Sequence, residues 1–183
     1  MQVVHAAQLR VQAELDSLGE RSVRLADRKR LPYTNATISE IQRIANILPI
    51  NLLRTAAEDA DESGWHFPRG TLVIPQISVL LQDPRIWSDP SSFSPERFLE
   101  ADGATPKRIP EFLPFSIGRR QCLGESLARA ELFLIFTNTI KALRVEKASE
   151  LSRDRPLGLT VSPKAYSVRL YPRVKVDRNE NQV

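Results

Sequence analysis

The chain has 183 residues, and its 26 lysines and arginines against 22 aspartates and glutamates give a formal net charge of +4. A hydrophobic content of 42% and a charged content of 26% exclude wholesale disorder, and so small a net charge gives no reason to expect nucleic acid as a partner. A single cysteine excludes an intramolecular disulfide and any zinc or iron–sulfur site built on two or more cysteines. The two histidines, His5 and His66, lie far apart in the sequence, so a multi-histidine metal site is not expected.

The first half of the chain carries two predicted helices. Apolar residues recur near helical spacing over residues 4–18, and Gly19 marks the predicted end. A second helix is predicted over residues 37–48, where Thr37 and Glu40 have the spacing of a capping box and a proline follows the last turn.

Short strands and a long irregular connection are predicted next. Residues 50–54, 65–67 and 71–74 have the character of strands, the last two separated by a Pro-Arg-Gly turn, and residues 76–81 favour a short helix. Residues 82–114 are rich in proline, serine and aspartate, yet carry aromatic side chains at intervals. Such a long connection is typical of a functional or wrapping segment, and its aromatics are expected to pack.

The longest helix is predicted over residues 123–143, with apolar residues over more than half of its surface, which predicts deep burial. Residues 157–161 and 166–171 alternate between apolar and polar side chains and predict a hairpin. The tail over residues 174–183 is polar.

The segment before the longest helix contains Phe115, Gly118, Arg120, Cys122 and Gly124. A thiol at a helix N-terminus meets free backbone N–H groups and the positive end of the helix dipole, both of which stabilise a thiolate. Glycines on both sides allow a tight loop and the close approach of a flat ligand, and the arginine offers a planar fork for a carboxylate. A lone cysteine is more often a small buried hydrophobe, but this spacing favours a ligand site.

These five residues match F-x-x-G-x-R-x-C-x-G, and the segment resembles the haem-binding motif of the cytochrome P-450 family. The continuation over residues 123–133 resembles microsomal, animal-type members. Two further motifs of the family occur in the same order: Glu40 and Arg43 resemble its E-x-x-R, and residues 93–98 resemble its P-E-R-F segment. The resemblance covers residues 8–173.

The resemblance implies an α+β, mainly α fold: the C-terminal part of the cytochrome P-450 fold, with helices of the J, K and L type, small antiparallel sheets, a long meander and a cysteine haem loop. Members of the family are more than twice as long. The small-residue, glycine, acid and threonine pattern of their oxygen-activating I helix has no counterpart in residues 1–183, which are therefore expected to form one partial domain that begins inside the J helix.

The resemblance also implies roles for particular residues. Cys122 would be the axial ligand of the iron of haem b, while Arg120 and Arg54 would pair with the haem propionates. Leu53 stands where the family usually has a histidine. Phe115, Gly118 and Gly124 would contact the haem. A buried ion-pair network would be formed by Glu40, Arg43 and Arg97. The substrate pocket would be lined by Ile50, Leu52, Leu159 and Val161, with ordinary core as the alternative for these four.

The implied activity is that of a haem-thiolate monooxygenase, which inserts one oxygen atom from O2 into a small lipophilic substrate. Electrons would come from an NADPH-cytochrome reductase that docks near Lys107, Arg108 and Arg119, although a merely solvated basic face is the alternative. A truncated, inactive chain that keeps the haem motif is a rival reading. A cysteine-nucleophile hydrolase is another, but neither histidine belongs to a recognisable cysteine–histidine pattern.

The resemblance places the parent protein at the endoplasmic reticulum membrane, held by an N-terminal anchor outside this chain. No run in the sequence approaches the roughly 20 apolar residues that span a bilayer, and the first residues lack the apolar core of a signal peptide. Taken alone, the chain is expected to be cytoplasmic.

Overall fold

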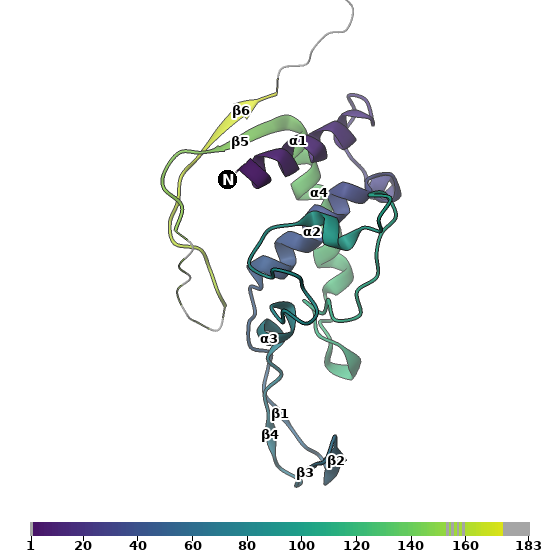
Figure 1. The fold of residues 1–183 in the computed structure, drawn as a ribbon, viewed down its shortest axis with the longest axis vertical. Helices are drawn as coiled ribbons and strands as arrows, with labels where there is room; N and C mark the ends of the chain where they lie inside the picture. The colour runs from purple at the N-terminus through teal and green to yellow at the C-terminus, as the bar shows by residue number, and fades with distance from the viewer. Residues whose placement is uncertain (1, 153, 155, 157, 159, 174–183) are drawn as a thin grey trace, which may run out of the picture.

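The computed structural model describes residues 2–173 except 153, 155, 157 and 159. Figure 1 shows a helical body from which strands β2 (Ala60–Glu62) and β3 (Trp65–Phe67) project at one end, while a ribbon of β5 (Leu143–Lys147) and β6 (Val168–Pro172) lies at the other. The helical elements are α1 (Gln2–Asp16), η1 (Leu25–Arg30), α2 (Pro32–Ala45), α3 (Ile77–Leu81), η2 (Pro95–Phe98), η3 (Gly118–Arg120) and α4 (Glu125–Ala142). The three long helices and the short one at 77–81 lie where the sequence predicts helices.

Helix α2 begins more than a turn before its predicted start and ends at Ala45, so the expected capping box is wrong. Pro32 occupies its first turn, and the cap comes from α1: the Glu14 carboxylate accepts hydrogen bonds from the backbone N–H groups of Tyr33 and Thr34, each at 2.8 Å. Thr37 lies inside the helix, and its hydroxyl donates to the carbonyl of Tyr33 at 2.9 Å. A cap that comes from another helix leaves no local signal in the sequence.

The strands form three antiparallel pairs among the described residues. They are β1 (Arg54–Thr55) with β4 (Leu72–Val73), β2 (Ala60–Glu62) with β3 (Trp65–Phe67), and β5 (Leu143–Lys147) with β6 (Val168–Pro172). The predicted hairpin between residues 157–161 and 166–171 is wrong, because β6 pairs with the strand that leaves α4. Leu157, Leu159 and the polar tail over 174–183 lie outside the described residues. Mixed helices and small antiparallel sheets confirm the α+β class.

The core joins α1, α2 and α4 to the long irregular connection over residues 82–114, which we call the meander. Val11 and Leu15 of α1 and Phe133 of α4 are buried together with the aromatic side chains of the meander. The ring centroids of Trp87 and Phe98 are 5.7 Å apart, and each ring also packs on Phe112. The expectation that the aromatics of the long connection pack is therefore confirmed.

The prediction that α4 is deeply buried is wrong for the part of the chain that the structure describes. Phe133 and Thr137 are its buried residues, whereas Leu127 is 63% and Ile135 is 67% exposed. A wide apolar face predicts that a helix is covered, but it does not say that the same chain supplies the cover. None of the described helices combines the length and the apolar character that crossing a membrane requires.

Candidate functional site

Glu40 and Arg43 of α2 form an ion pair that is fully buried. Arg43 donates to the two carboxylate oxygens of Glu40 at 2.7 and 2.9 Å, and Arg97 of the meander donates to one of them at 3.2 Å. The backbone N–H of Ser94 donates to the same oxygen at 2.9 Å, and Arg43 also donates to the carbonyl of Leu81 at 3.0 Å. These bonds compensate the buried charges and fasten α2 to the meander, which sets geometry more than it adds net stability.

The cysteine loop, residues 113–124, joins the meander to α4. The backbone N–H of Cys122 donates to the carbonyl of Phe115 at 3.0 Å and closes the loop. Ser116 and Gly118 have φ angles of +66° and +81°, in the left-handed region that residues other than glycine rarely adopt. The closed loop leaves the Cys122 thiol exposed at its surface, just before the first turn of α4.

Arg54 of β1 reaches the cysteine loop from a distant part of the chain. Its Nη2 lies 3.5 Å from the hydroxyl oxygen of Ser116 and 3.4 Å from the carbonyl oxygen of Arg120, so the arginine donates to both. The structure thereby brings Arg54 to the loop that carries Arg120 and Cys122. Sequence reasoning missed Ser116, because neither its left-handed backbone nor its contact with Arg54 leaves a local signal.

The two glycines of the loop differ in what the chain itself requires. Gly118 needs its positive φ, whereas Gly124 has a φ of −88°, which any residue adopts. Apart from the glycine and its neighbours in sequence, a Cβ added to either glycine would meet no atom of the described residues within 4 Å. The side chains of Ile117 and Leu123 beside them are apolar and exposed, Leu123 fully. An exposed thiol, an arginine bonded to the same loop, two glycines with open space beside them and the exposed apolar side chains of Ile117 and Leu123 fit a flat apolar ring that carries acidic groups, as haem does.

Phe115 and Arg129 form a further contact of the loop. The guanidinium carbon of Arg129 lies 4.9 Å from the centroid of the Phe115 ring, and its Nε donates to Glu125 at 2.8 Å. This cation–π contact fixes the first turn of α4 against the loop. Sequence reasoning did not single out Arg129, whose role depends on a loop fold that the motif alone does not define.

The predicted substrate residues lie at the surface or outside the described part of the chain. Ile50 and Leu52 are 47% and 72% exposed, so the described residues do not bury them in a core. Val161 is half-buried, and its backbone N–H donates to the carbonyl of Ile47 at 2.8 Å. Leu159 lies outside the described residues.

The remaining candidates are exposed. Lys107, Arg108 and Arg119 are all at the surface. His66 bonds Asp61 at 2.8 Å within the β2–β3 pair, and His5 lies on α1, so neither histidine contacts Cys122. Within the described part of the chain no cluster of His, Cys, Asp and Glu side chains has the arrangement of a metal site. Because neither histidine contacts Cys122, the geometry does not support the hypothesis of a cysteine-nucleophile hydrolase.

The model of the family described as cytochrome P450 matches residues 5–170. The chain belongs to the cytochrome P450 family. It is 42% identical over 168 residues to cytochrome P450 2J5 of Mus musculus, covering 90% of this chain and 33% of that protein. It is 44% identical over 173 residues to cytochrome P450 2D28 of Mesocricetus auratus, covering 91% and 34%. These findings confirm the family resemblance, and the chain spans about a third of the length of the curated relatives it matches.

Proposed function

We propose that this chain is the haem-binding segment of a haem-thiolate monooxygenase, with the thiolate of Cys122 as the axial ligand of the iron of haem b. The observation that carries the proposal is the exposed Cys122 thiol on a loop closed by its own hydrogen bond to Phe115. Proteins of the cytochrome P450 family bind haem, and every position of the haem motif is present here.

The residues around the thiol have separate tasks. Arg54 and Arg120 bind the two propionates, because a guanidinium matches a carboxylate in charge and in planar shape. Gly118 provides the turn, and Gly124 leaves room for the ring to approach the backbone. When bound, the haem supplies iron for the activation of O2 and the insertion of one oxygen atom into an organic substrate, and a thiolate ligand favours cleavage of the O–O bond.

The organic substrate is small and lipophilic in this proposal. The exposed apolar side chains of Ile50 and Leu52 support it, since they follow α2 and precede the strand that carries Arg54. Val161, whose backbone contacts Ile47, and Leu159 are the other proposed members of this pocket. An NADPH-cytochrome reductase docks at the basic face around Lys107 and supplies the electrons. The whole protein to which this segment belongs is located at the endoplasmic reticulum in this proposal.

The 183-residue chain by itself is proposed to be inactive, as part of a larger domain whose other segments cover α4. Leu123, Leu127 and Ile135 have exposed side chains, so the described residues leave the apolar face of the helix in water. Monooxygenation requires a site from which water is excluded. The same exposure also favours a second candidate function: a truncated product that is not part of any monooxygenase, keeps the haem motif and performs no turnover.

The test is to titrate haem into the purified chain and record the reduced, carbon-monoxide difference spectrum, followed by turnover with NADPH and reductase. A thiolate-type Soret band without product formation is the expected result. Absence of that band at saturating haem would overturn Cys122 as the ligand. Product formation by this chain alone would overturn its inactivity, while leaving the ligand assignment intact.

A further inference from the structure

Three side chains from different helical elements meet at η2. Glu96 of η2 forms an ion pair with Arg10 of α1 and accepts a hydrogen bond from the hydroxyl of Tyr33 of α2 at 3.2 Å. The guanidinium carbon of Arg10 lies 3.7 Å from the centroid of the Tyr33 ring. We call Arg10, Tyr33 and Glu96 the clasp, because together they connect three segments that are far apart in the sequence.

The clasp is more than an exposed ion pair. Arg10 and Glu96 have side chains that are 50% and 51% exposed, and such a pair alone contributes little to stability. Tyr33, in contrast, is buried, and its backbone N–H is held by the Glu14 carboxylate at 2.8 Å. Burial and the nearby charge of Glu96 raise the pKa of Tyr33 to about 12, so its hydroxyl stays a donor at neutral pH. The cation–π contact with Arg10 adds to these bonds.

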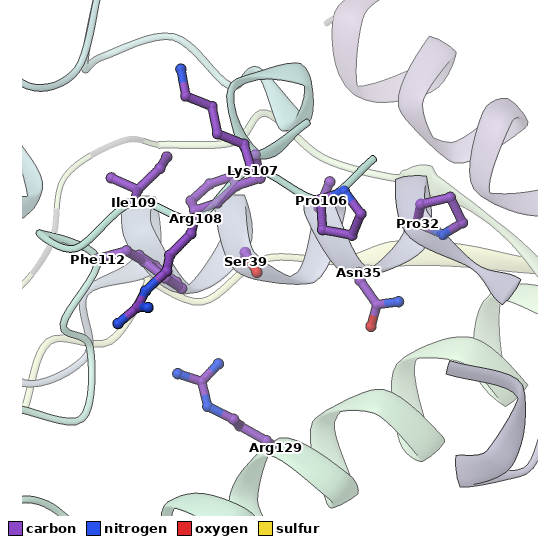
Figure 2. Close-up of a pocket in the computed structure, with 11 residues that line it drawn as sticks. Pro32, Asn35, Ser39, Pro106, Lys107, Arg108, Ile109, Phe112 and Arg129 are labelled. Carbon is purple, nitrogen blue, oxygen red and sulfur yellow. The ribbon is translucent and has the colours of Figure 1, made fainter. Parts of the chain in front are cut away.

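Through η2, the clasp is connected to the cysteine loop. Phe98 lies two residues after Glu96, is buried, and has its ring centroid 4.8 Å from that of Phe112. Figure 2 shows that the segment from Pro106 to Phe112 runs along α2, with Phe112 at its far end. The cysteine loop begins at the next residue. A rotation of η2 would therefore displace the ring that supports the entry to the loop, since packed side chains transmit such shifts.

The clasp and the buried network attach η2 in different places. Arg97 donates to Glu40 in the second half of α2, whereas its neighbour Glu96 bonds α1 and the first turn of α2. A short helix that is held at one point can pivot about it, and a second point removes that freedom. The network alone therefore does not determine the orientation of η2.

We propose that Arg10, Tyr33 and Glu96 are positioning residues for the cysteine loop: they hold η2 in the orientation in which Phe98 supports Phe112. Without the clasp, η2 pivots on the buried network, and the bond between the Cys122 N–H and the Phe115 carbonyl opens more often. This role in closing the loop does not require haem. Its consequence, a thiol held where it can bind iron, rests on the proposed function.

Amide hydrogen exchange of the haem-free chain, measured by mass spectrometry on residues 113–124, tests the proposal. The backbone N–H of Cys122 donates within this loop, so its exchange reports how often the loop opens. Glu96→Ala is expected to speed exchange there about tenfold, because it removes charge-assisted bonds, and to leave β5 unchanged. Glu100→Ala is the matched control, since Glu100 is an exposed meander carboxylate whose side chain bonds no described residue. It is expected to change exchange by less than about twofold.

Two conservative variants separate positioning from a general loss of stability. Tyr33→Phe keeps the buried ring and removes the hydroxyl, and it is expected to speed exchange of the loop about threefold. Glu96→Gln keeps an acceptor for that hydroxyl and is expected to recover part of the protection lost in Glu96→Ala. With haem bound, the fraction of the thiolate-type Soret band in the reduced, carbon-monoxide spectrum is expected to follow the same order. If Glu96→Ala does not fold, the comparison of Tyr33→Phe with Glu100→Ala decides.

Two results would overturn the positioning role. One is equal exchange of residues 113–124 in the clasp variants and in Glu100→Ala. The other is an equal increase at residues 143–147 of β5, which would show that the whole chain has become less stable. A loop that loses protection in the clasp variants, while the unsubstituted chain gives no thiolate-type band, would support the positioning role and overturn only the proposed haem function.

Discussion

The α2–meander network and the cysteine loop use the same kinds of residue in opposite ways. Glu40 and Arg43 are fully buried, and their charged groups are compensated by partners inside the chain. Cys122 and Arg120 are both exposed, and the bond that Arg120 makes to Arg54 uses its backbone carbonyl and not its guanidinium group. The buried charges of Glu40 and Arg43, which have partners inside the chain, hold the fold together. The exposed groups of Cys122 and Arg120 are held in place by the loop, and they indicate where another molecule binds.

The largest expected effect is on the buried network. Glu40→Ala leaves the Arg43 guanidinium buried without its counter-ion, so the free energy of unfolding is expected to fall by about 3–5 kcal/mol. Urea denaturation followed by circular dichroism measures it. Glu146→Gln, which breaks the exposed pair with Arg144, is the control and is expected to cost no more than about 1 kcal/mol. Equal stability of the two variants would contradict the distinction between the two regions.

The second prediction concerns the arginines at the loop. Arg54→Gln and Arg120→Gln are each expected to raise the haem dissociation constant about tenfold, because charge-assisted hydrogen bonds contribute about 1.5–3 kcal/mol. Transfer of haem to apomyoglobin measures its retention. Arg119→Gln, next to Arg120 but outside the motif, is expected to change retention by less than about twofold. If Arg119→Gln releases haem as fast as the other two, general positive charge and not specific pairing holds the haem.

The two glycines of the loop separate stability from binding. Gly118→Ala is expected to lower the free energy of unfolding by about 1–2 kcal/mol, because its φ of +81° is costly for alanine. Gly124→Ala is expected to change it by less than about 0.5 kcal/mol, since its backbone and surroundings accept a Cβ. The same Gly124→Ala change is expected to weaken haem retention. Unchanged haem retention in that variant would show that the ring does not approach this backbone.

The smallest effect is a pH dependence in the meander. Hydrogen bonds from the Thr105 hydroxyl and from the backbone N–H groups of Thr105 and Ala104 lower the pKa of Asp102 to about 2, from an ordinary value of 3.8. Because the folded-state pKa is depressed, this contribution to stability is present above pH 3.8 and is lost as the pH falls through about 2. The difference in stability between the unsubstituted chain and Asp102→Ala is expected to be smaller at pH 3 than at pH 6. A difference that stays constant would contradict the ionised contacts.

Local sequence signals located the long helices of this fold and missed what distant residues determine. Apolar spacing placed α4 nearly to the residue, but the start of α2 depends on Glu14 from another helix. The partner of β6 was misassigned for the same reason, since Gln8 of α1 accepts the N–H of Val145 and positions β5. Contacts between segments far apart in the sequence have no periodicity from which they can be read.

The candidate site was predictable in its members and less so in its geometry. The motif named Cys122 and Arg120, and the family resemblance added Arg54, which the structure brings to the same loop. The left-handed backbone of Ser116 and the cation–π contact of Arg129 required coordinates, because neither follows from residue type or spacing. Motifs thus identified the chemistry of the site, and the fold added the residues that support it.

The central claim is that the sulfur of Cys122 bonds the iron of haem, and X-ray absorption at the iron edge measures that bond directly. The haem complex of the unsubstituted chain is expected to show one sulfur scatterer in the first coordination shell of the iron. Cys122→Ser, in which the exposed position keeps its fold, is expected to lose it. A first shell without sulfur in the unsubstituted complex, or one that is unchanged by Cys122→Ser, would contradict the account.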